Sequence, residues 1–429
     1  MSSIDKSGTI RDFGEMPPER KLVAQLRDYG SSANGPGTFT MHMCRRMPAE
    51  FDAIQIVLHG AASGANTFKA AIAPSAQFNN GWQPKDAANA DQTFTAVTFG
   101  TTDRQNPRNP GGGAATATVT GTSGSNASGD LIEGDIASDI ISLRSLDRTD
   151  IVGAPPLLMV RVYGVSLPAS NASESSAVNA NPWSSVIPDF YSGYWATDAI
   201  ATPPGAAPSQ DWLPNITINC FLRGKRVYNM AVAGDSVEQG WIAATAVPQF
   251  GGNINGWGRR FAKLCNDIGV PVSYISLAHT GQKSRVFHER AINYLLTGSL
   301  THLFVKVWST NESADGMASA YAAVDRCNKI IQMCLDRGVI PILVPPWGGQ
   351  GDGTAMKTYV LDYIEKCKQS GILVFDPRSI TDASNGTLRQ DFKTVNSGGA
   401  VVDGTHLNSF GQDEVAMFAF RMRREFMFA

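Results

Sequence analysis

The chain has 429 residues, of which 43% are hydrophobic, and its formal net charge at pH 7 is −2. This length favours two or three domains, and the apolar fraction is sufficient for ordinary hydrophobic cores. The small net charge gives no reason to expect nucleic acid or an anionic membrane as a partner. No apolar run is long enough to span a membrane, and residues 1–16 lack the apolar stretch of a signal peptide. We therefore expect a cytoplasmic location by default, or release by a signal-independent route.

Residues 1–224 are predicted to be rich in β-strands. Residues 1–50 are mixed in character and are expected to form an extended or loosely structured lead-in. Residues 51–224 are expected to form an antiparallel β-sandwich, because short alternating segments are separated by clusters of Gly, Asn, Ser and Pro. The expected strands cover residues 53–60, 93–100, 116–121 and 157–164.

One stretch of this domain, residues 165–215, differs from the rest in composition. It is rich in Ser, Ala and Pro, and it also contains several Trp and Tyr residues. That aromatic content is too high for a plain flexible linker. The stretch is either an ordered excursion on the sandwich or a loop near the active site.

From residue 225 to residue 429 the pattern changes to strands that alternate with helices. We expect strands over 227–232, 272–278, 302–308, 339–344 and 372–375, and helices over 253–268, 285–296, 315–337, 354–369 and 410–426. This alternation predicts a parallel sheet with helices on both faces, which is a three-layer α/β/α sandwich.

The six cysteines form no CxxC pair. They are Cys44, Cys220, Cys265, Cys327, Cys334 and Cys367. Four of them lie in predicted helices, on or near the apolar face, so the sequence predicts buried free thiols and no disulfide framework.

Polar residues follow several strands of the predicted parallel sheet. Ser236 follows the first strand, Gly281 the second and Asn311 the third, while Asp403 and His406 follow the fifth. The carboxyl ends of parallel strands meet at one edge of a sheet, and ligands bind at that edge. We therefore expect these five residues to lie together.

Their residue types suit nucleophilic catalysis. The hydroxyl of Ser236 becomes a good nucleophile when a base takes its proton, and His406 can be that base near neutral pH. Asp403 is close enough in sequence to orient the imidazole and to stabilise its positive charge. The backbone N–H groups of Ser236 and Gly281 and the side-chain amide of Asn311 would then form an oxyanion hole.

This pattern resembles that of the SGNH or GDSL hydrolase family over residues 225–429. The matching residues are Gly234-Asp235-Ser236 in the first sequence block, Gly281 in the second, Asn311 in the third and Asp403-x-x-His406 in the last. The resemblance implies a flavodoxin-like α/β/α fold and a serine ester hydrolase that uses no metal and no cofactor. Two of the sequence blocks depart from the family pattern. The third block usually reads Gly-x-Asn-Asp and here reads Ser309-Thr310-Asn311-Glu312, and Val237 replaces a common leucine.

Simpler structural roles stay open for the candidates. Ser236 can serve as a helix N-cap, Asn311 as a turn residue and Gly281 as the glycine of a tight loop. The tryptophans near the site are core residues by default. Trp308 and Trp347 end two strands, however, and His279 is close to Gly281, so these three are candidates for a substrate wall.

We expect a small-molecule or glycan ester as the substrate. A β-sandwich beside a domain of this kind suggests carbohydrate O-acetyl esters, by analogy of architecture. An acyltransferase with a sugar acceptor would use the same triad. A carbohydrate- or receptor-binding protein with an idle hydrolase site is the alternative from another class. The sequence predicts no particular oligomeric state.

Overall fold

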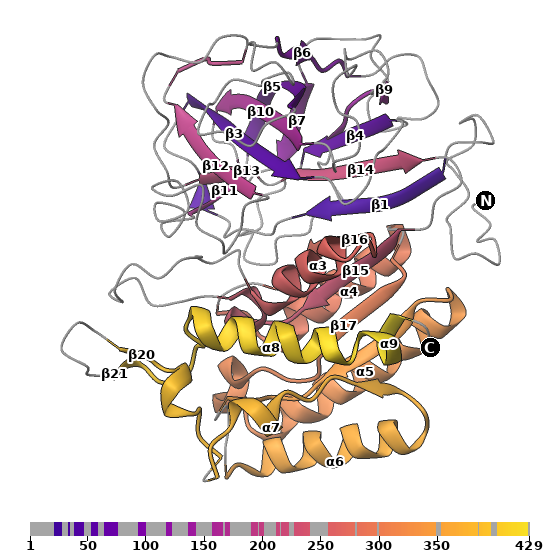
Figure 1. Ribbon diagram of the computed structural model, residues 1–429, viewed down its shortest axis with the longest axis vertical. Coiled ribbons are helices and arrows are strands. Elements are labelled where there is room, and N and C mark those ends of the chain that lie inside the picture. The colour runs from indigo at the N-terminus through magenta and orange to yellow at the C-terminus, as the bar shows by residue number, and fades with distance from the viewer. Residues whose placement is uncertain are drawn as a thin grey trace. The chain divides into compact units, whose positions relative to one another are not determined.

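The chain divides into two compact units, Met1–Val227 and Tyr228–Ala429. The computed structural model describes residues 21–27, 33–34, 38–46, 53–58, 64–75, 93–99, 117–121, 136–142, 157–165, 168–171, 190–195, 197–200, 212–214, 216–222, 227–240, 256–278, 281–297, 300–348, 353–384, 386–395 and 401–427. The described elements of the first unit are β-strands, whereas the second unit alternates strands with helices (Figure 1).

The second unit is built on a parallel sheet. Its strands are β15 (Tyr228–Ala233), β16 (Val272–Ser276), β17 (His302–Lys306), β18 (Ile340–Val344) and β19 (Leu373–Val374). Their order is β19-β18-β17-β15-β16, and each neighbouring pair is parallel. This is the flavodoxin-like order that the family resemblance implies. The order reverses between β15 and β17, so the ligand-binding edge is expected at the carboxyl ends of these two strands.

Helices and short turns connect these strands. The helices are α3 (Trp257–Asp267), α4 (Ser284–Thr297), α5 (Met317–Asp336), α6 (Ala355–Gln369), α7 (Arg378–Thr381), α8 (Ser409–Arg421) and α9 (Arg423–Met427). The short elements are α2 (Ser236–Gln239), the 3-10 turns η2 (Thr310–Asp315) and η3 (Gln390–Phe392), and the strands β20 (Thr394–Val395) and β21 (Val401–Asp403). In the described part of the chain, no helix combines the length and the apolar character that a membrane crossing requires.

Side chains alternate between the two faces of the sheet, and each face carries its own core. Ala231 and Ala233 of β15 belong to a buried cluster with residues of α4, α5 and α6. Met230 and Val232 of the same strand belong to a second cluster with residues of α3, α8 and α9. Because the side chains of a strand alternate with a period of two residues, helices pack on both faces of the sheet. This gives the predicted three layers.

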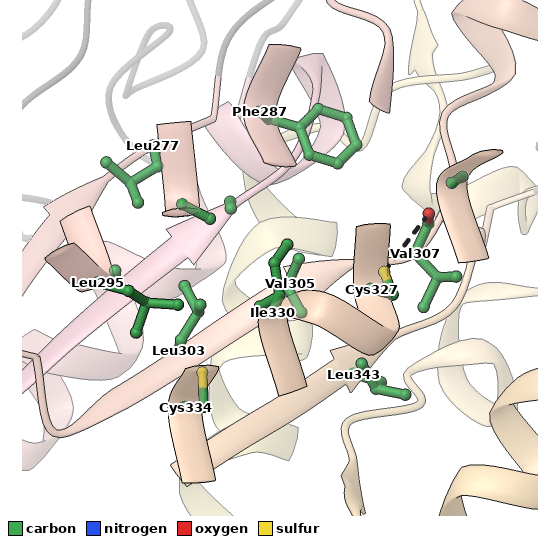
Figure 2. Packing of buried hydrophobic residues seen from close by; sticks show 14 of the residues in the cluster. Leu277, Phe287, Leu295, Leu303, Val305, Val307, Cys327, Ile330, Cys334 and Leu343 are labelled. Carbon is green, nitrogen blue, oxygen red and sulfur yellow. Dashed lines mark hydrogen bonds between the residues drawn. The ribbon is translucent and has the colours of Figure 1, made fainter. Parts of the chain in front are cut away.

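The first of these cores also holds two cysteines. Figure 2 shows Cys327, Ile330 and Cys334 of α5 packed over Leu303 and Val305 of β17. Burial raises the pKa of the Cys334 thiol to about 12, so this thiol is protonated and unreactive at neutral pH. Cys220 and Cys265 are likewise buried and free, and Cys367 is free and half-buried. The side chain of Cys44 lies outside the described residues.

Two expected helices differ from those observed. The expected helix over 315–337 begins only at Met317, because Gly316 has φ +67° and separates α5 from the 3-10 turn η2. The expected helix over 410–426 is interrupted at Met422, which divides it into α8 and α9. The expected start of another helix at residue 253 lies outside the described residues.

The described strands of the first unit form antiparallel sheets. They are β1 (Lys21–Arg27), β2 (Ala33–Asn34), β3 (Thr38–Arg46), β4 (Ala53–Leu58), β5 (Gly64–Ser75), β6 (Thr95–Ala96), β7 (Ala117–Gly121), β8 (Ile136–Ala137), β9 (Ile141–Ser142), β10 (Leu157–Val165), β11 (Pro168–Asn171), β12 (Phe190–Trp195), β13 (Trp212–Pro214) and β14 (Ile216–Leu222). One sheet has the order β1-β14-β4-β8, a second has the order β12-β3-β10-β5-β6, and a third has the order β13-β11-β2. The arrangement of these sheets as a sandwich stays a prediction.

Residues 1–50, expected as an extended or loosely structured lead-in, contain the strands β1 and β3. The two residues of β3 whose burial is described, Thr40 and His42, are buried and polar. Thr40 donates to the carbonyl of Thr197, and His42 accepts a hydrogen bond from Arg161. Part of the 165–215 stretch is also strand, since β12 pairs with β3.

Candidate active site

The turn after β15 carries Ser236 as the first residue of α2. Asp235 is the N-cap of this short helix, and its carboxylate accepts from the N–H of Val237 at 3.1 Å. The side chain of Glu238 returns to the N–H of Asp235 at 3.2 Å, which completes a capping box. A Cβ at Gly234 would lie 2.5 Å from Oε2 of Glu238, so this position requires glycine. The local sequence thus fixes the backbone that presents the Ser236 hydroxyl.

A histidine from the far end of the unit contacts this hydroxyl. The Nε2 atom of His406 lies 2.7 Å from Oγ of Ser236, and its Nδ1 atom lies 2.8 Å from Oδ2 of Asp403. Oδ1 of Asp403 accepts from the N–H groups of Thr405 at 2.8 Å and His406 at 3.0 Å. The loop after β21 therefore holds the carboxylate and the ring together.

Burial alone would raise the pKa of Asp403, but the hydrogen bonds from the His406 ring and from backbone N–H groups outweigh burial and hold that pKa below its usual value. Asp403 is therefore ionised at neutral pH and only accepts hydrogen bonds. This makes Nδ1 of His406 the donor and leaves Nε2 as the acceptor for the Ser236 hydroxyl. The arrangement has the geometry that proton transfer from serine to histidine requires.

The loop after β17 brings Asn311 to the same edge. Its Nδ2 atom donates to the carbonyl of Gln282 at 3.0 Å, which joins this loop to the loop after β16. Gly281, next to Gln282, is exposed and has φ +75°, a left-handed conformation that favours glycine. Asn311 is exposed as well, so its amide can change its hydrogen-bond partner when a ligand binds.

The unusual third block, Ser309 to Glu312, has a structural explanation. Ser309 is the N-cap of η2, and with Glu312 it forms a second capping box. Oγ of Ser309 accepts from the N–H of Asn311 at 3.2 Å and donates to Oδ2 of Asp235 at 2.7 Å. The serine that replaces the usual glycine therefore connects the Asn311 loop to the Ser236 turn.

A buried group of charges lies behind Ser236. We call Asp235, Glu238 and Lys306 the ion cluster; their side chains are at most 1% exposed. Nζ of Lys306 lies 2.9 Å from Asp235 and 3.0 Å from Oε2 of Glu238, and Trp347 donates from Nε1 to Oε1 of Glu238 at 2.9 Å.

The cluster shifts the pKa values of its members. Burial would raise the pKa of Asp235, but the Lys306 ammonium holds it below its usual value. For Glu238 burial prevails over the same ammonium and raises the pKa to about 7. Burial lowers the pKa of Lys306, but the two carboxylates outweigh burial and raise it. The lysine is therefore a cation that two carboxylates share.

Sequence analysis did not identify Lys306 or Glu238 as parts of the site. Two signals point to them. Lys306 is a charged residue inside the apolar strand His302–Lys306, and a buried lysine requires a charged or polar partner. Asp235-x-x-Glu238 has the spacing of a capping box after a strand.

Two of the three candidates for a substrate wall do not fit the structure. Trp308 and Trp347 are fully buried, and their indole N–H groups donate to Ser319 and Glu238 respectively. Both rings belong to the core, which leaves no surface for a substrate. The third candidate, His279, lies outside the described residues. Among the described residues, no group of three or more His, Cys, Asp or Glu side chains could hold a metal ion.

Comparisons with known proteins find similarity among solved structures. No family model matches the chain, and no curated protein matches it. A GDSL-like lipase from Bacteroides thetaiotaomicron matches this chain with 14% sequence identity and a TM-score of 0.33. The match covers 45% of this chain and 85% of the lipase chain. The psychrotrophic esterase EstA from a Pseudoalteromonas species matches at 11% identity over 47% of this chain and 98% of its own, with a TM-score of 0.36.

The match to another solved structure extends over both units of this chain. Protein YXIM from Bacillus subtilis matches at 12% identity over 99% of this chain and 92% of its own, with a TM-score of 0.36.

Proposed function

We propose that the protein is a serine ester hydrolase in which Ser236 is the nucleophile, His406 the general base and acid, and Asp403 the orienting carboxylate. The observation that carries this proposal is the continuous contact from Asp403 through both nitrogens of His406 to Oγ of Ser236, at 2.8 and 2.7 Å. An N-cap role for a serine would not explain this contact, and Asp235 already fills the N-cap position. The names of the similar solved structures, an esterase and a lipase, agree with the proposal.

The reaction begins when Nε2 of His406 takes the proton of the Ser236 hydroxyl and Oγ attacks the ester carbonyl. The negative charge that develops on the carbonyl oxygen is stabilised by the N–H groups of Ser236 and Gly281 and by the Asn311 amide. The imidazolium donates its proton to the departing alcohol, and an acyl-enzyme remains. Water, activated by the same histidine, then releases the acid. Asp403 stabilises the imidazolium in both steps.

The test is hydrolysis of p-nitrophenyl acetate by the parent protein and by Ser236→Ala. We expect turnover by the parent and a loss of at least about 1,000-fold in the variant. Ser370→Ala is the matched control, because its hydroxyl donates to the carbonyl of Lys366 at the end of α6, and it should equal the parent. If Ser236→Ala equals the parent, Ser236 is not the nucleophile. If the parent shows no turnover and no labelling by a fluorophosphonate probe, the site is idle.

For the substrate we propose a carbohydrate O-acetyl ester, on the grounds of the antiparallel sheets that precede the hydrolase unit. Acetate release from an acetylated xylan, compared with hydrolysis of a p-nitrophenyl octanoate, tests this choice. Turnover of the octanoate without acetate release from any acetylated glycan would contradict it. A sugar acceptor added to the assay distinguishes transfer from hydrolysis, because a transferase would form an acylated sugar in place of free acid.

A further inference from the structure

Lys306 occupies an unusual place for a charged side chain. It is the last residue of β17, its side chain is 0% exposed, and β17 pairs with apolar strands on both sides. A buried ion pair contributes little net stability compared with apolar side chains of the same volume. The reason for the lysine is therefore better sought in what its two partners do.

Both partners belong to the turn that carries the nucleophile. Asp235 accepts from the N–H of Val237, and Glu238 accepts from the N–H of Asp235. These two contacts on either side of Ser236 set the direction of its N–H and its hydroxyl. Two carboxylates this close repel each other, and the Lys306 ammonium between them neutralises that repulsion.

The same ammonium also affects the loop that carries Asn311. Asp235 accepts from Ser309 at Oδ2, and Ser309 in turn accepts from the N–H of Asn311. A continuous path of hydrogen bonds thus runs from Lys306 through Asp235 and Ser309 to Asn311. It joins the carboxyl ends of β15 and β17, the two strands between which the sheet order reverses.

We propose that Lys306 is a positioning residue for the hydrolytic reaction: by bridging Asp235 and Glu238 it fixes Ser236 and Asn311 in the relative geometry that the oxyanion requires. This inference rests on the proposed function, because it assigns Lys306 a role in that reaction. Lys306 contacts Asp235 and Glu238, and through them it acts on the backbone of the Ser236 turn. Its removal should lower the rate of the chemical step and leave substrate binding unchanged.

The test is Lys306→Met, assayed with p-nitrophenyl acetate at a temperature at which circular dichroism shows a folded protein. We expect kcat to fall about 100-fold with KM within about twofold, because a displacement of about 1 Å costs on that order. The rate of Ser236 labelling by a fluorophosphonate probe should fall in parallel. Leu295→Ala, in the core between the sheet and α4, is the control for lost stability. It should lower Tm and leave kcat unchanged.

Ser309→Ala provides a second measurement that keeps the charges in place. It removes the link between Asp235 and Asn311 and should lower kcat roughly 10-fold at constant KM. The inference is overturned if Lys306→Met keeps kcat within twofold of the parent, or if Leu295→Ala loses kcat to the same extent. If Lys306→Met does not fold, an unchanged kcat in Ser309→Ala overturns it. A parent protein that neither hydrolyses the ester nor is labelled at Ser236 would instead refute the proposed function, and this inference with it.

Discussion

Nε2 of His406 lies 2.7 Å from Oγ of Ser236, although 170 residues separate the two in sequence. The contact exists because β15 and the loop after β21 deliver their residues to one edge of the second unit. The contact also requires the tautomer of His406 in which Nε2 carries no proton. Nδ1 of His406 donates to Asp403, so Nε2 is the atom that takes the serine proton.

The role of Asp403 is tested by Asp403→Asn. The amide keeps the size of the side chain but can donate a hydrogen bond to Nδ1, which favours the wrong tautomer of His406. We expect kcat to fall about 10⁴-fold with little change in fold. Asp267→Asn, which alters an exposed carboxylate bonded to Lys263, is the matched control and should equal the parent. A loss below tenfold in Asp403→Asn would exclude the orienting role.

The oxyanion role of Asn311 is tested by Asn311→Ala. Removal of one donor should lower kcat by about 100- to 1,000-fold, because the donor acts on charge that develops only in the transition state. Stability should change little, since the side chain is exposed. Asn328→Ala removes an exposed amide that accepts from Tyr363 on the far side of α5, and it should have no effect on kcat. A rise in KM at constant kcat would show that Asn311 only binds the substrate.

The buried His288 makes stability depend on pH. Its Nε2 atom donates to the carbonyl of Lys306 at 2.8 Å, and Nδ1 accepts from Arg326 at 3.3 Å. Burial lowers its pKa to about 3, from 6.5 in the unfolded chain. The unfolded state therefore binds a proton between these values that the folded state does not bind. The contribution to stability is complete above pH 6.5 and is lost as the pH falls toward 3.

His288→Gln can supply the same donor and acceptor without titrating. The stability of the parent relative to this variant should fall by about 2 kcal/mol between pH 6.5 and pH 5, at roughly 1.4 kcal/mol per pH unit. Urea unfolding at several pH values measures this difference. Other groups that titrate, such as the buried His42, are common to both proteins and cancel. Parallel stability curves would show that His288 titrates normally.

The packing of α3 on the sheet depends on Gly258. A Cβ at this position would lie 2.8 Å from the ring of Tyr274 and 2.8 Å from Cγ2 of Val232. Gly258→Ala should therefore lower the free energy of unfolding by about 1–3 kcal/mol, despite the better helix propensity of alanine. Thermal and urea unfolding check this value. Lys263→Ala, a partly exposed position on the same helix, should change stability by less than about 0.5 kcal/mol. Equal stability of Gly258→Ala and the parent would mean that α3 can shift away from the sheet.

The parallel sheet was predictable because its strands are short apolar runs that alternate with helical patterns. Ser236, Asn311 and His406 were found by their place relative to those runs. Lys306 was not found in this way, because a charged residue within a strand does not indicate which residues it pairs with. The partners, Asp235 and Glu238, lie 71 and 68 residues earlier. In strand β3 the buried residues Thr40 and His42 are polar, and His42 accepts a hydrogen bond from Arg161 of β10.

The separation in sequence between the nucleophile Ser236 and the base His406 has a consequence during synthesis of the protein. At about 5–20 residues per second, the ribosome makes His406 roughly 10 to 30 s after Ser236. Throughout that interval the nascent chain carries a serine that no base can activate. A chain cut by a protease between β19 and β21 would lose the base in the same way. Hydrolytic activity therefore requires that synthesis has passed His406.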